Sequence, residues 1–297
     1  MININVTGST GFVGTYLIKN FQKIYIFKKH IFSENLKNID SDVFLHLAGK
    51  AHDLKNVSNF EEYYQVNTEL TKKIFDAFLV SNAKIFITLS SVKAVADEIV
   101  DELIEDHSPN PVTHYGKSKL LAEQYILSKL DSIEKRVYIL RPCMIHGPGN
   151  KGNLNLLYNI VSKGLPWPLG AFENKRSFCS IDNLCFIIRE LIENDQIPSG
   201  IYNISDDELL STNELIDLIS ESLGKKSLIW KVPQSLIKTF SKLGDVLRLP
   251  LNSERLSKLT ETYIVSNNKI KKAINKPLPI SAKAGLIKTF NSFNNNA

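Results

Sequence analysis

A glycine-rich turn near the N-terminus constrains the fold of this chain more than any other feature. The turn, residues 7–14 (TGSTGFVG), follows an apolar segment from Met1 to Val6 and precedes a helical pattern from Thr15 to Phe21. Glycines here allow a tight turn, close approach of the backbone to a pyrophosphate, and close packing of helix on strand. The pattern therefore predicts a helix N-terminus that binds the phosphates of a dinucleotide, with a plain glycine-rich turn as the alternative.

Further apolar segments alternate with helical patterns along the chain. Strands are predicted at residues 23–27, 42–47, 84–89, 136–140 and 200–205, and helices at 67–82, 115–130 and 215–223. Residues 211–214 (STNE) predict a capped start for the last of these helices, and Asp182 is expected to cap a further helix that begins there. Strands that alternate with helices form parallel sheets covered by helices on both faces. We therefore expect an α/β fold with a Rossmann-type, doubly wound parallel sheet. Ligands of such sheets bind beyond the carboxyl ends of the strands.

Composition and charge exclude several classes of protein. The 297 residues carry a net charge of +5, and the lysines form scattered pairs instead of a basic stripe, so no nucleic-acid partner is expected. No apolar run approaches the ~20 residues of a membrane span, and none has the pattern of a signal peptide. Cys143, Cys179 and Cys185 are odd in number and form no C-x-x-C pair. This cysteine usage argues against a disulfide framework or a metal site and favours a cytoplasmic location.

Small and polar residues stand where several predicted strands end. Ala48-Gly49 follows the third strand, where small residues let a cofactor lie against the backbone. Ser90-Ser91 follows the next strand, where a hydroxyl can hydrogen-bond a substrate oxygen. At the end of the second strand, Lys28-Lys29 replaces the acid that binds the ribose of NAD in many proteins. The lysines would suit the 2′-phosphate of NADP(H), although a solvated lysine pair explains them equally well.

Tyr115 and Lys119 are the strongest candidates for acid–base chemistry. They are four residues apart at the start of a predicted helix, so both side chains lie on one face. A free phenol has a pKa near ~10. A nearby ammonium would lower that pKa and make proton exchange with an alcohol or ketone feasible. The same spacing is common on solvated helices, so its meaning depends on the surrounding site.

Taken in order, several motifs resemble the extended short-chain dehydrogenase/reductase family, which includes sugar-nucleotide epimerases, dehydratases and reductases. They are TGSTGFVG (7–14), HLAG (46–49), SS (90–91), YGKSK (115–119), RPCMIHGPG (141–149), GLPWPLG (164–170) and NKRSFCSIDNL (174–184). They follow the order and spacing of that family over nearly the whole chain. The resemblance implies a dinucleotide-binding domain at residues 1–142, with a returning segment near 176–195. A smaller α+β substrate-binding cap would occupy most of 143–297.

The resemblance also implies roles for individual residues. Tyr115 would be the general acid–base, Lys119 would hold the nicotinamide ribose and lower the tyrosine pKa, and Ser91 would hydrogen-bond the reacting sugar oxygen. The cofactor NAD(H) or NADP(H) is expected to contact Gly8, Thr10, Gly11, Phe12, Val13, Gly14, Lys28, Leu47, Ala48, Gly49, Asn67, Ser90, Tyr115, Lys119 and Pro142. The expected substrate contacts are Ser91, Asn153, Leu169 and Arg176. Arg176 would grip a diphosphate, with a surface salt bridge as its alternative role.

Two enzymatic functions fit this resemblance. The leading expectation is reduction of the C4 ketone of a UDP-linked 4-keto-6-deoxy-N-acetylhexosamine, or of its polyprenyl-diphosphate form, in surface polysaccharide synthesis. The alternative is NAD-dependent 4-epimerisation of a UDP-hexose or UDP-N-acetylhexosamine. The SVK motif (91–93) departs from the commonest epimerases, as does His146 where a tyrosine is frequent. A non-catalytic nucleotide-binding regulator is a third hypothesis, which the Tyr115–Lys119 pair disfavours.

Two further expectations concern the surface of the protein. The segment Ser235–Leu249 carries an apolar stripe with lysines beside it. The stripe consists of Leu236, Ile237, Phe240, Leu243 and Leu247. This pattern fits a membrane-surface helix but favours a helix packed on the core of the cap. The resemblance also implies a homodimer formed through the helices at 67–82 and 116–130.

Overall fold

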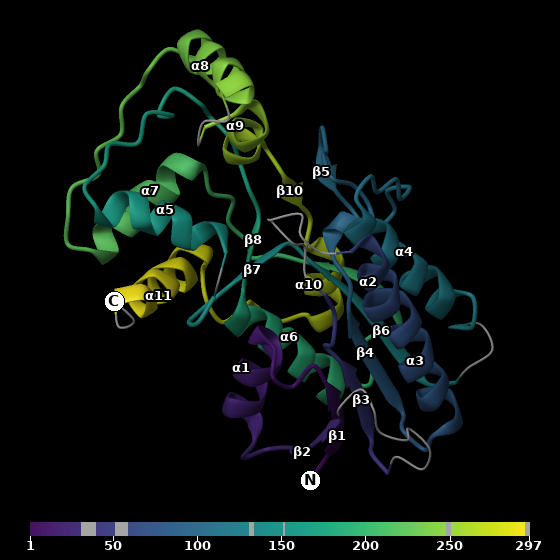
Figure 1. Ribbon diagram of the computed structural model, residues 1–297. Helices are drawn as coiled ribbons and strands as arrows, with labels where there is room; N and C mark the ends of the chain where they lie inside the picture. The colour runs from purple at the N-terminus through teal and green to yellow at the C-terminus, as the bar shows by residue number, and fades with distance from the viewer. Residues whose placement is uncertain (31–39, 51–58, 131–133, 151, 248–250, 295–297) are drawn as a thin grey trace.

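A six-stranded parallel sheet lies among the helices α1, α2, α3, α4 and α6 (Figure 1). The computed structural model describes residues 1–30, 40–50, 59–130, 134–150, 152–247 and 251–294. The strand order is β2-β1-β3-β4-β6-β9. The bounds are β1 (Asn3–Thr7), β2 (Ile26–His30), β3 (Val43–His46), β4 (Ile85–Leu89), β6 (Arg136–Pro142) and β9 (Gly200–Ile204). The predicted α/β Rossmann-type fold is confirmed.

Side chains that alternate along each strand build two separate cores. On β4, Ile85 and Ile87 join the hydrophobic cluster on one face, whereas Phe86 joins the cluster on the other. The first face is covered by α1 (Phe12–Phe21), α6 (Ile181–Glu193) and α10 (Asn268–Ile274), and the second by α3 (Leu70–Val80) and α4 (His114–Leu127). Because both faces are buried, the central strands β3 and β4 are almost entirely apolar, as is typical of parallel sheets.

The helix that was predicted to begin at Asn67 begins earlier and contains an irregular turn. It consists of α2 (Phe60–Tyr63), a π-helical turn η1 (Tyr64–Glu69), and α3. The π turn directs two polar side chains toward α4: Thr68 donates to the carbonyl of Ser118 at 2.7 Å, and the amide of Asn67 donates to the hydroxyl of Ser118 at 3.0 Å. Single π turns are frequent at functional sites.

A second group of helices lies to one side of the sheet (Figure 1). It comprises α5 (Asn153–Ser162), α7 (Thr212–Ser222), α8 (Gln234–Leu247), α9 (Ser253–Thr260) and α11 (Ala282–Asn294). Their buried side chains, among them Leu157, Ile219 and Phe290, form a separate hydrophobic cluster. Two short parallel sheets accompany this group, β7 (Met144–His146) with β8 (Phe178–Ser180), and β5 (Glu102–Leu103) with β10 (Ile264–Val265).

Two expectations about helix starts have different outcomes. The predicted start of α7 is confirmed, because Ser211 and Glu214 form a reciprocal capping box. The expectation that Asp182 caps α6 is wrong. Ser180 is the N-cap and its hydroxyl accepts from the amide of Asp182 at 3.3 Å. The Asp182 carboxylate instead accepts from Tyr16 and Lys288.

The expected packing of α8 on the core of the cap is correct for only part of its apolar stripe. Ile237 is buried against the cap core, but Leu236, Phe240, Leu243 and Leu247 are 49–61% exposed. Helical spacing explains the split, because Ile237, Ser241 and Gly244 form one buried face while the exposed residues form the adjacent face. Among the described residues, no helix has the length and apolarity needed to span a bilayer.

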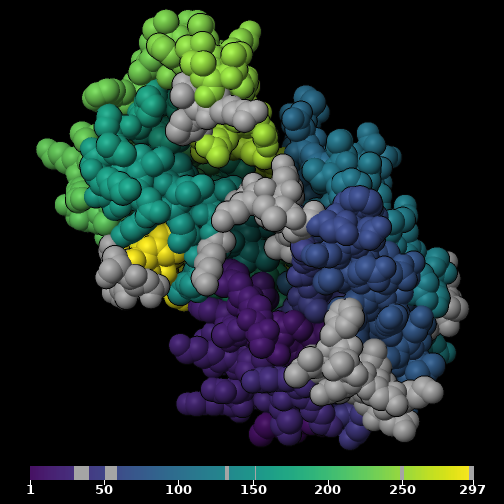
Figure 2. Space-filling model, in the orientation of Figure 1, coloured from purple at the N-terminus to yellow at the C-terminus, as the bar shows by residue number. Residues whose placement is uncertain are grey.

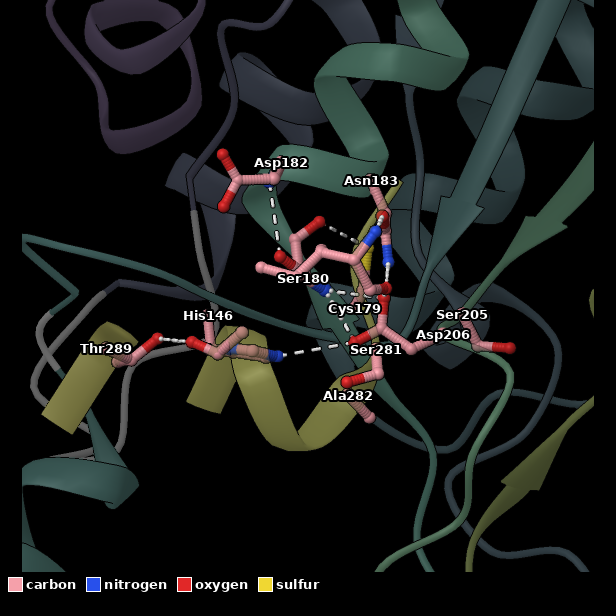
Figure 3. A network of polar contacts seen from close by, with 12 residues as sticks. His146, Cys179, Ser180, Asp182, Asn183, Ser205, Asp206, Ser281, Ala282 and Thr289 are labelled. Atoms are coloured by element: carbon pink, nitrogen blue, oxygen red, sulfur yellow. Dashed lines mark hydrogen bonds and ion pairs between the residues drawn. The ribbon is translucent and has the colours of Figure 1, made fainter. Parts of the chain in front are cut away.

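A buried polar network joins segments that are far apart in the sequence (Figure 3). The carboxylate of Asp206, just after β9, accepts from the amide of Ser180 at 2.9 Å and from the side chain of Asn183 at 2.7 Å. His146 on β7 lies between Asp206, at 3.4 Å, and the hydroxyl of Thr289 on α11, at 3.0 Å. The network therefore connects α11 of the second helical group to β7, β8 and α6 and to the end of β9 in the central sheet.

Candidate active site

The glycine turn between β1 and α1 packs too tightly for any side chain at two of its positions. A Cβ at Gly8 would lie 2.4 Å from the amide nitrogen of Ala48, and Gly8 has φ +74°. A Cβ at Gly14 would lie 2.3 Å from the carbonyl oxygen of Gly8. Gly11 caps α1 without a side-chain hydrogen bond, and the first turn of α1, which begins with Phe12 and Val13, holds no acid. The turn therefore fits an anionic pyrophosphate at a helix N-terminus.

A cavity of about 700 Å³ opens beside this turn. Its lining includes Thr10, Gly11 and Phe12 from the turn and Pro148 and Gly149 from the loop after β7. Ser91, Tyr115 and Lys119 are not among its lining residues. The cavity therefore lies beside the turn and is separate from the predicted acid–base group.

The loop after β3 meets the π turn and α4 at one point. Leu47 and Ala48 pack on Gly8, and Gly49 is exposed. A Cβ at Gly49 would lie 3.0 Å from the ammonium nitrogen of Lys119 and 3.2 Å from the side-chain oxygen of Asn67. The buried side chain of Asn67 accepts from the amide of Lys50 at 2.8 Å and donates to the carbonyl of Lys50 at 3.2 Å. Asn67 thus fixes the backbone that follows β3.

Ser91 and Tyr115 come together because the start of α4 packs directly on the turn after β4. Ser91 caps the short 3-10 turn Val92–Ala94 by accepting from the amide of Lys93 at 3.2 Å. A Cβ at Gly116 would lie 2.3 Å from the carbonyl oxygen of Lys93, so only glycine lets the helix approach this closely. Tyr115 and Ser91 are joined by a side-chain hydrogen bond.

The electrostatics of Tyr115 differ from the prediction that Lys119 lowers the pKa of the phenol. Burial raises the pKa of Tyr115, the hydrogen bond with Ser91 lowers it in part, and Tyr63 raises it further. The ring of Tyr63 stands edge-on to that of Tyr115, with centroids 6.1 Å apart. The ammonium of Lys119 donates to the carbonyl of Leu89 at 2.9 Å. Desolvation of the phenol therefore outweighs any effect of Lys119 in this arrangement.

Lys119 itself is a buried cation with a perturbed pKa. Burial lowers its pKa to about 8, while the carboxylate of Glu123, one turn further along α4, acts in the opposite direction. A lysine in this range exchanges protons readily near neutral pH. Its position between the carbonyl end of β4 and Gly49 places the ammonium at the carboxyl edge of the sheet.

Sequence reasoning missed a buried ion pair beneath these residues. The guanidinium of Arg141 donates to the carboxylate of Glu123 at 2.6 and 3.0 Å, and both side chains are at most 3% exposed. Ser90 also donates to Glu123. The signal was present, since Glu123 follows Lys119 by one helical turn and Arg141 ends an apolar strand. A buried charge at either position predicts an oppositely charged partner, but the sequence does not show which residue that partner is.

The remaining predicted residues lie in different places. Pro142 is buried at the end of β6, and Lys28 lies on the edge strand β2, 3.8 Å from the carboxylate of Asp40. Asn153 is exposed at the start of α5, and Leu169 is buried in the cap cluster. Lys28 is thus next to Asp40, Asn153 is open to solvent, and Leu169 contributes to the apolar core of the cap.

Arg176 is held by partners from the C-terminal part of the chain. Its guanidinium lies 3.2 Å from the carboxylate of Glu261 and donates to the carbonyl of Lys258 at 2.8 Å. Burial lowers the pKa of Lys93, the carboxylates of Glu261 and Asp97 oppose this effect, and repulsion from the nearby Arg176 adds to it. The ammonium of Lys93 sits 4.2 Å from the ring centre of Tyr263. Lys93 and Arg176 thus bring positive charge to the region beside Ser91, a role that the sequence did not indicate for Lys93.

Comparison with known proteins gives a consistent result. Residues 4–205 match the NAD dependent epimerase/dehydratase family. The chain is 30% identical to the UDP-glucose 4-epimerase of Vibrio cholerae, with 98% of this chain and 95% of that protein covered. It is 28% identical to the N-acetyl-alpha-D-glucosaminyl-diphospho-ditrans,octacis-undecaprenol 4-epimerase of Escherichia coli O157:H7, with 91% and 85% covered. The UDP-glucuronic acid 4-epimerase from Bacillus cereus, solved in complex with NAD, shares the fold, with a TM-score of 0.75, 19% identity and 99% of each chain covered.

Proposed function

The chain belongs to the NAD dependent epimerase/dehydratase family, and from this premise we propose that it interconverts UDP-linked hexoses or N-acetylhexosamines that differ in configuration at C4. The V. cholerae and E. coli relatives, which match most of the chain, are both 4-epimerases. They favour epimerisation over the reduction that was the leading expectation from sequence. Reduction of a 4-keto sugar would use the same side chains. The two reactions differ in that reduction consumes reduced nicotinamide, whereas epimerisation causes no net consumption of it.

The observation that carries this proposal is the meeting of Ser91, Tyr115 and Lys119 at the carboxyl end of β4. Tyr115, in its phenolate form, takes the proton from the C4 hydroxyl of the sugar and so becomes a phenol, which later returns that proton to the C4 oxygen of the 4-keto intermediate. Ser91, already hydrogen-bonded to Tyr115, holds the same oxygen. Positioned proton transfer of this kind contributes roughly 10²–10⁴-fold to a rate.

The residues around this group fit a nicotinamide dinucleotide. Gly8 and Gly14 form a turn that no Cβ could enter, and the uncapped start of α1 favours phosphate. Gly49 is exposed and places no side chain against the polar atoms of Lys119 and Asn67, which suits close approach of a ribose. When bound, the cofactor supplies the acceptor and then the donor of hydride at C4 of the sugar. Lys28 on β2 would lie near a 2′-phosphate if the cofactor were NADP(H).

The proposed substrate contacts extend from Ser91 toward the second helical group. Arg176 and Lys93 supply positive charge for a diphosphate, and Asn153 and the backbone at Leu169 complete the substrate side. The separate hydrophobic clusters of the sheet and of α5, α7, α8, α9 and α11 support a division into a dinucleotide-binding part and a cap near Pro142. Segment 176–195, which contains β8 and α6, returns to the sheet. We also expect a homodimer through α3 and α4, in the reducing environment of the cytoplasm.

One assay separates the proposed reaction from its alternative. The purified protein is incubated with UDP-glucose, UDP-galactose and their N-acetylhexosamine counterparts, and the products are resolved by chromatography. We expect each sugar to approach the same equilibrium mixture with its 4-epimer from either side, with no net consumption of reduced nicotinamide. Stoichiometric consumption of NADPH by a UDP-4-keto sugar, without interconversion of 4-epimers, would show instead that the protein is a reductase.

A further inference from the structure

The helix α8 presents an apolar face that no part of the described chain covers. Leu236, Phe240, Leu243 and Leu247 follow one another at helical spacing and are 50%, 61%, 49% and 58% exposed. Val246, beside them, is 78% exposed. Large apolar side chains exposed singly are ordinary on a protein surface, but a continuous stripe of them marks an interaction site.

The opposite side of α8 is fixed firmly to the rest of the protein. Ile237, Ser241 and Gly244 are buried, and a Cβ at Gly244 would lie 2.0 Å from the carbonyl oxygen of Leu251. The helix therefore cannot rotate to bury its exposed stripe without losing this close contact. In Figures 1 and 2 α8 lies at the far end of the second helical group, away from the sheet, so its exposed face is presented at an extremity of the molecule.

The charges on and next to α8 indicate which kind of surface the stripe contacts. Lys238 and Lys242 lie on the exposed side of the helix, and exposed Lys231 precedes it. The only acid of the helix is Asp245, whose carboxylate is occupied by the amide and hydroxyl of Ser253, at 2.9 and 2.6 Å. Exposed Trp230 (58%) stands next to Lys231. Around the helix, Val246 adjoins the stripe, and Lys242 and then Lys238 follow Val246 on the polar side. An apolar face bordered by a lysine-bearing polar face, with an aromatic residue nearby in the sequence, is the pattern of a helix that lies in the headgroup region of an anionic bilayer.

Size argues against a second protein molecule as the partner. Side chains that are roughly half exposed on one helix offer a few hundred Å², whereas a stable interface needs about 800 Å² per partner. The helix has 14 residues, so it is about 21 Å long and too short to cross a hydrocarbon core of about 30 Å. It can lie along a bilayer but not through it.

We propose that α8 docks the protein peripherally on the surface of an anionic phospholipid bilayer, with Leu236, Phe240, Leu243 and Leu247 inserted among the headgroups and the long side chains of Lys242 and Lys238 reaching the lipid phosphates from the polar side of the helix. This inference does not depend on which sugar the active site accepts. The lysines provide attraction that salt screens, whereas the apolar stripe provides attraction that salt leaves intact.

Sedimentation of the 297-residue protein with vesicles tests the proposal. One set of vesicles contains phosphatidylcholine alone, and the other contains phosphatidylcholine and phosphatidylglycerol in equal parts. We expect the wild-type protein to pellet with the anionic vesicles and to bind the neutral ones at least about tenfold more weakly. Phe240→Ser with Leu243→Ser, and separately Lys238→Gln with Lys242→Gln, should each reduce binding to the anionic vesicles by at least about tenfold.

The controls use apolar residues elsewhere on the surface that are more exposed than the stripe. Val80→Ser and Val100→Ser replace side chains that are 85% and 97% exposed, and neither should change vesicle binding. Circular dichroism and thermal unfolding confirm that all variants are folded. Wild-type protein that stays in the supernatant with both kinds of vesicle would overturn the proposal, as would full binding by the Phe240→Ser/Leu243→Ser variant. A wild-type dimer that this variant converts to a monomer, without vesicle binding by either, would assign the stripe to a second copy of the chain.

Discussion

The guanidinium of Arg141 is bound in a fork by the carboxylate of Glu123, with nitrogen–oxygen distances of 2.6 and 3.0 Å and both side chains almost fully buried. The pair lies beneath Lys119 and next to Ser90. Removing one partner leaves an uncompensated buried charge, which typically costs 3–5 kcal/mol. We therefore expect Glu123→Gln to lower the free energy of unfolding by about 3 kcal/mol or more in urea titrations.

A matched comparison separates loss of the ion pair from other effects of substitution. Glu254→Gln alters the exposed pair with Lys258 and should change stability by no more than about 0.5 kcal/mol. Adding Arg141→Met to Glu123→Gln removes the stranded cation and should restore part of the lost stability. If Glu123→Gln is as stable as the wild-type protein, the pair has no structural importance.

The buried side chain of His46 makes the folded protein less stable at acidic pH. The ring is buried on β3 between the hydroxyls of Thr7, at 2.6 Å, and Thr71, at 2.9 Å. Burial, with a smaller effect from Lys119, lowers its pKa from 6.5 to about 3. Between these two values the unfolded chain binds a proton at this position and the folded chain does not. Stability is therefore lost as pH falls from 6.5 toward 3, at up to about 1.4 kcal/mol per pH unit.

The measurement is the pH dependence of the free energy of unfolding in wild-type protein and in His46→Gln. The variant should be less stable at pH 7 but should lose stability less steeply below pH 6.5. Phe86→Leu, which alters a ring stacked on His46 at 6.4 Å, removes no titratable group and should keep the wild-type slope. Identical slopes for the wild-type protein and His46→Gln would contradict this explanation.

The glycine turn should tolerate no side chain at Gly14. A Cβ there would meet backbone atoms of Gly8 and Ser9 at 2.3 and 2.9 Å, so the turn itself must shift. We expect Gly14→Ala to weaken binding of NAD(H) by at least about tenfold, because the phosphate contacts depend on the position of the turn. Titration calorimetry measures the affinity. Gly152→Ala, with no atom within 4 Å of its new Cβ, should bind as tightly as the wild-type protein, and equal affinity in Gly14→Ala would refute the assigned role of the turn.

The parts of this structure that could be predicted are those in which a local pattern determines the outcome. The strands around Ile87 and Leu45 are continuous apolar runs, and Gly8 to Gly14 links strand to helix by a motif whose spacing has a steric reason. The capping box at Ser211 and Glu214 is equally local. The short strands β5, β7, β8 and β10 have two or three residues each, too few to show a period.

The features that could not be predicted depend on tertiary contacts. Nothing in the sequence around Arg141 indicates that Glu123 is its partner, because the two meet only when α4 packs on β6. The expectation that Lys119 lowers the pKa of Tyr115 was wrong. The spacing of the two residues carries no information about how deeply the phenol is buried, and burial raises its pKa. On α8, the sequence shows an apolar stripe but cannot show that Leu251 occupies only the side containing Gly244.

Replacement of Tyr115 by phenylalanine tests the central claim most directly, because it removes one hydroxyl from the meeting point of β4 and α4. The variant is assayed for interconversion of UDP-sugar 4-epimers, and its affinity for NAD(H) is measured in parallel. We expect turnover to fall by about 10²–10⁴-fold while cofactor affinity stays within about twofold of the wild-type value. Turnover at the wild-type rate in Tyr115→Phe would contradict the assignment of this residue as the group that moves the proton.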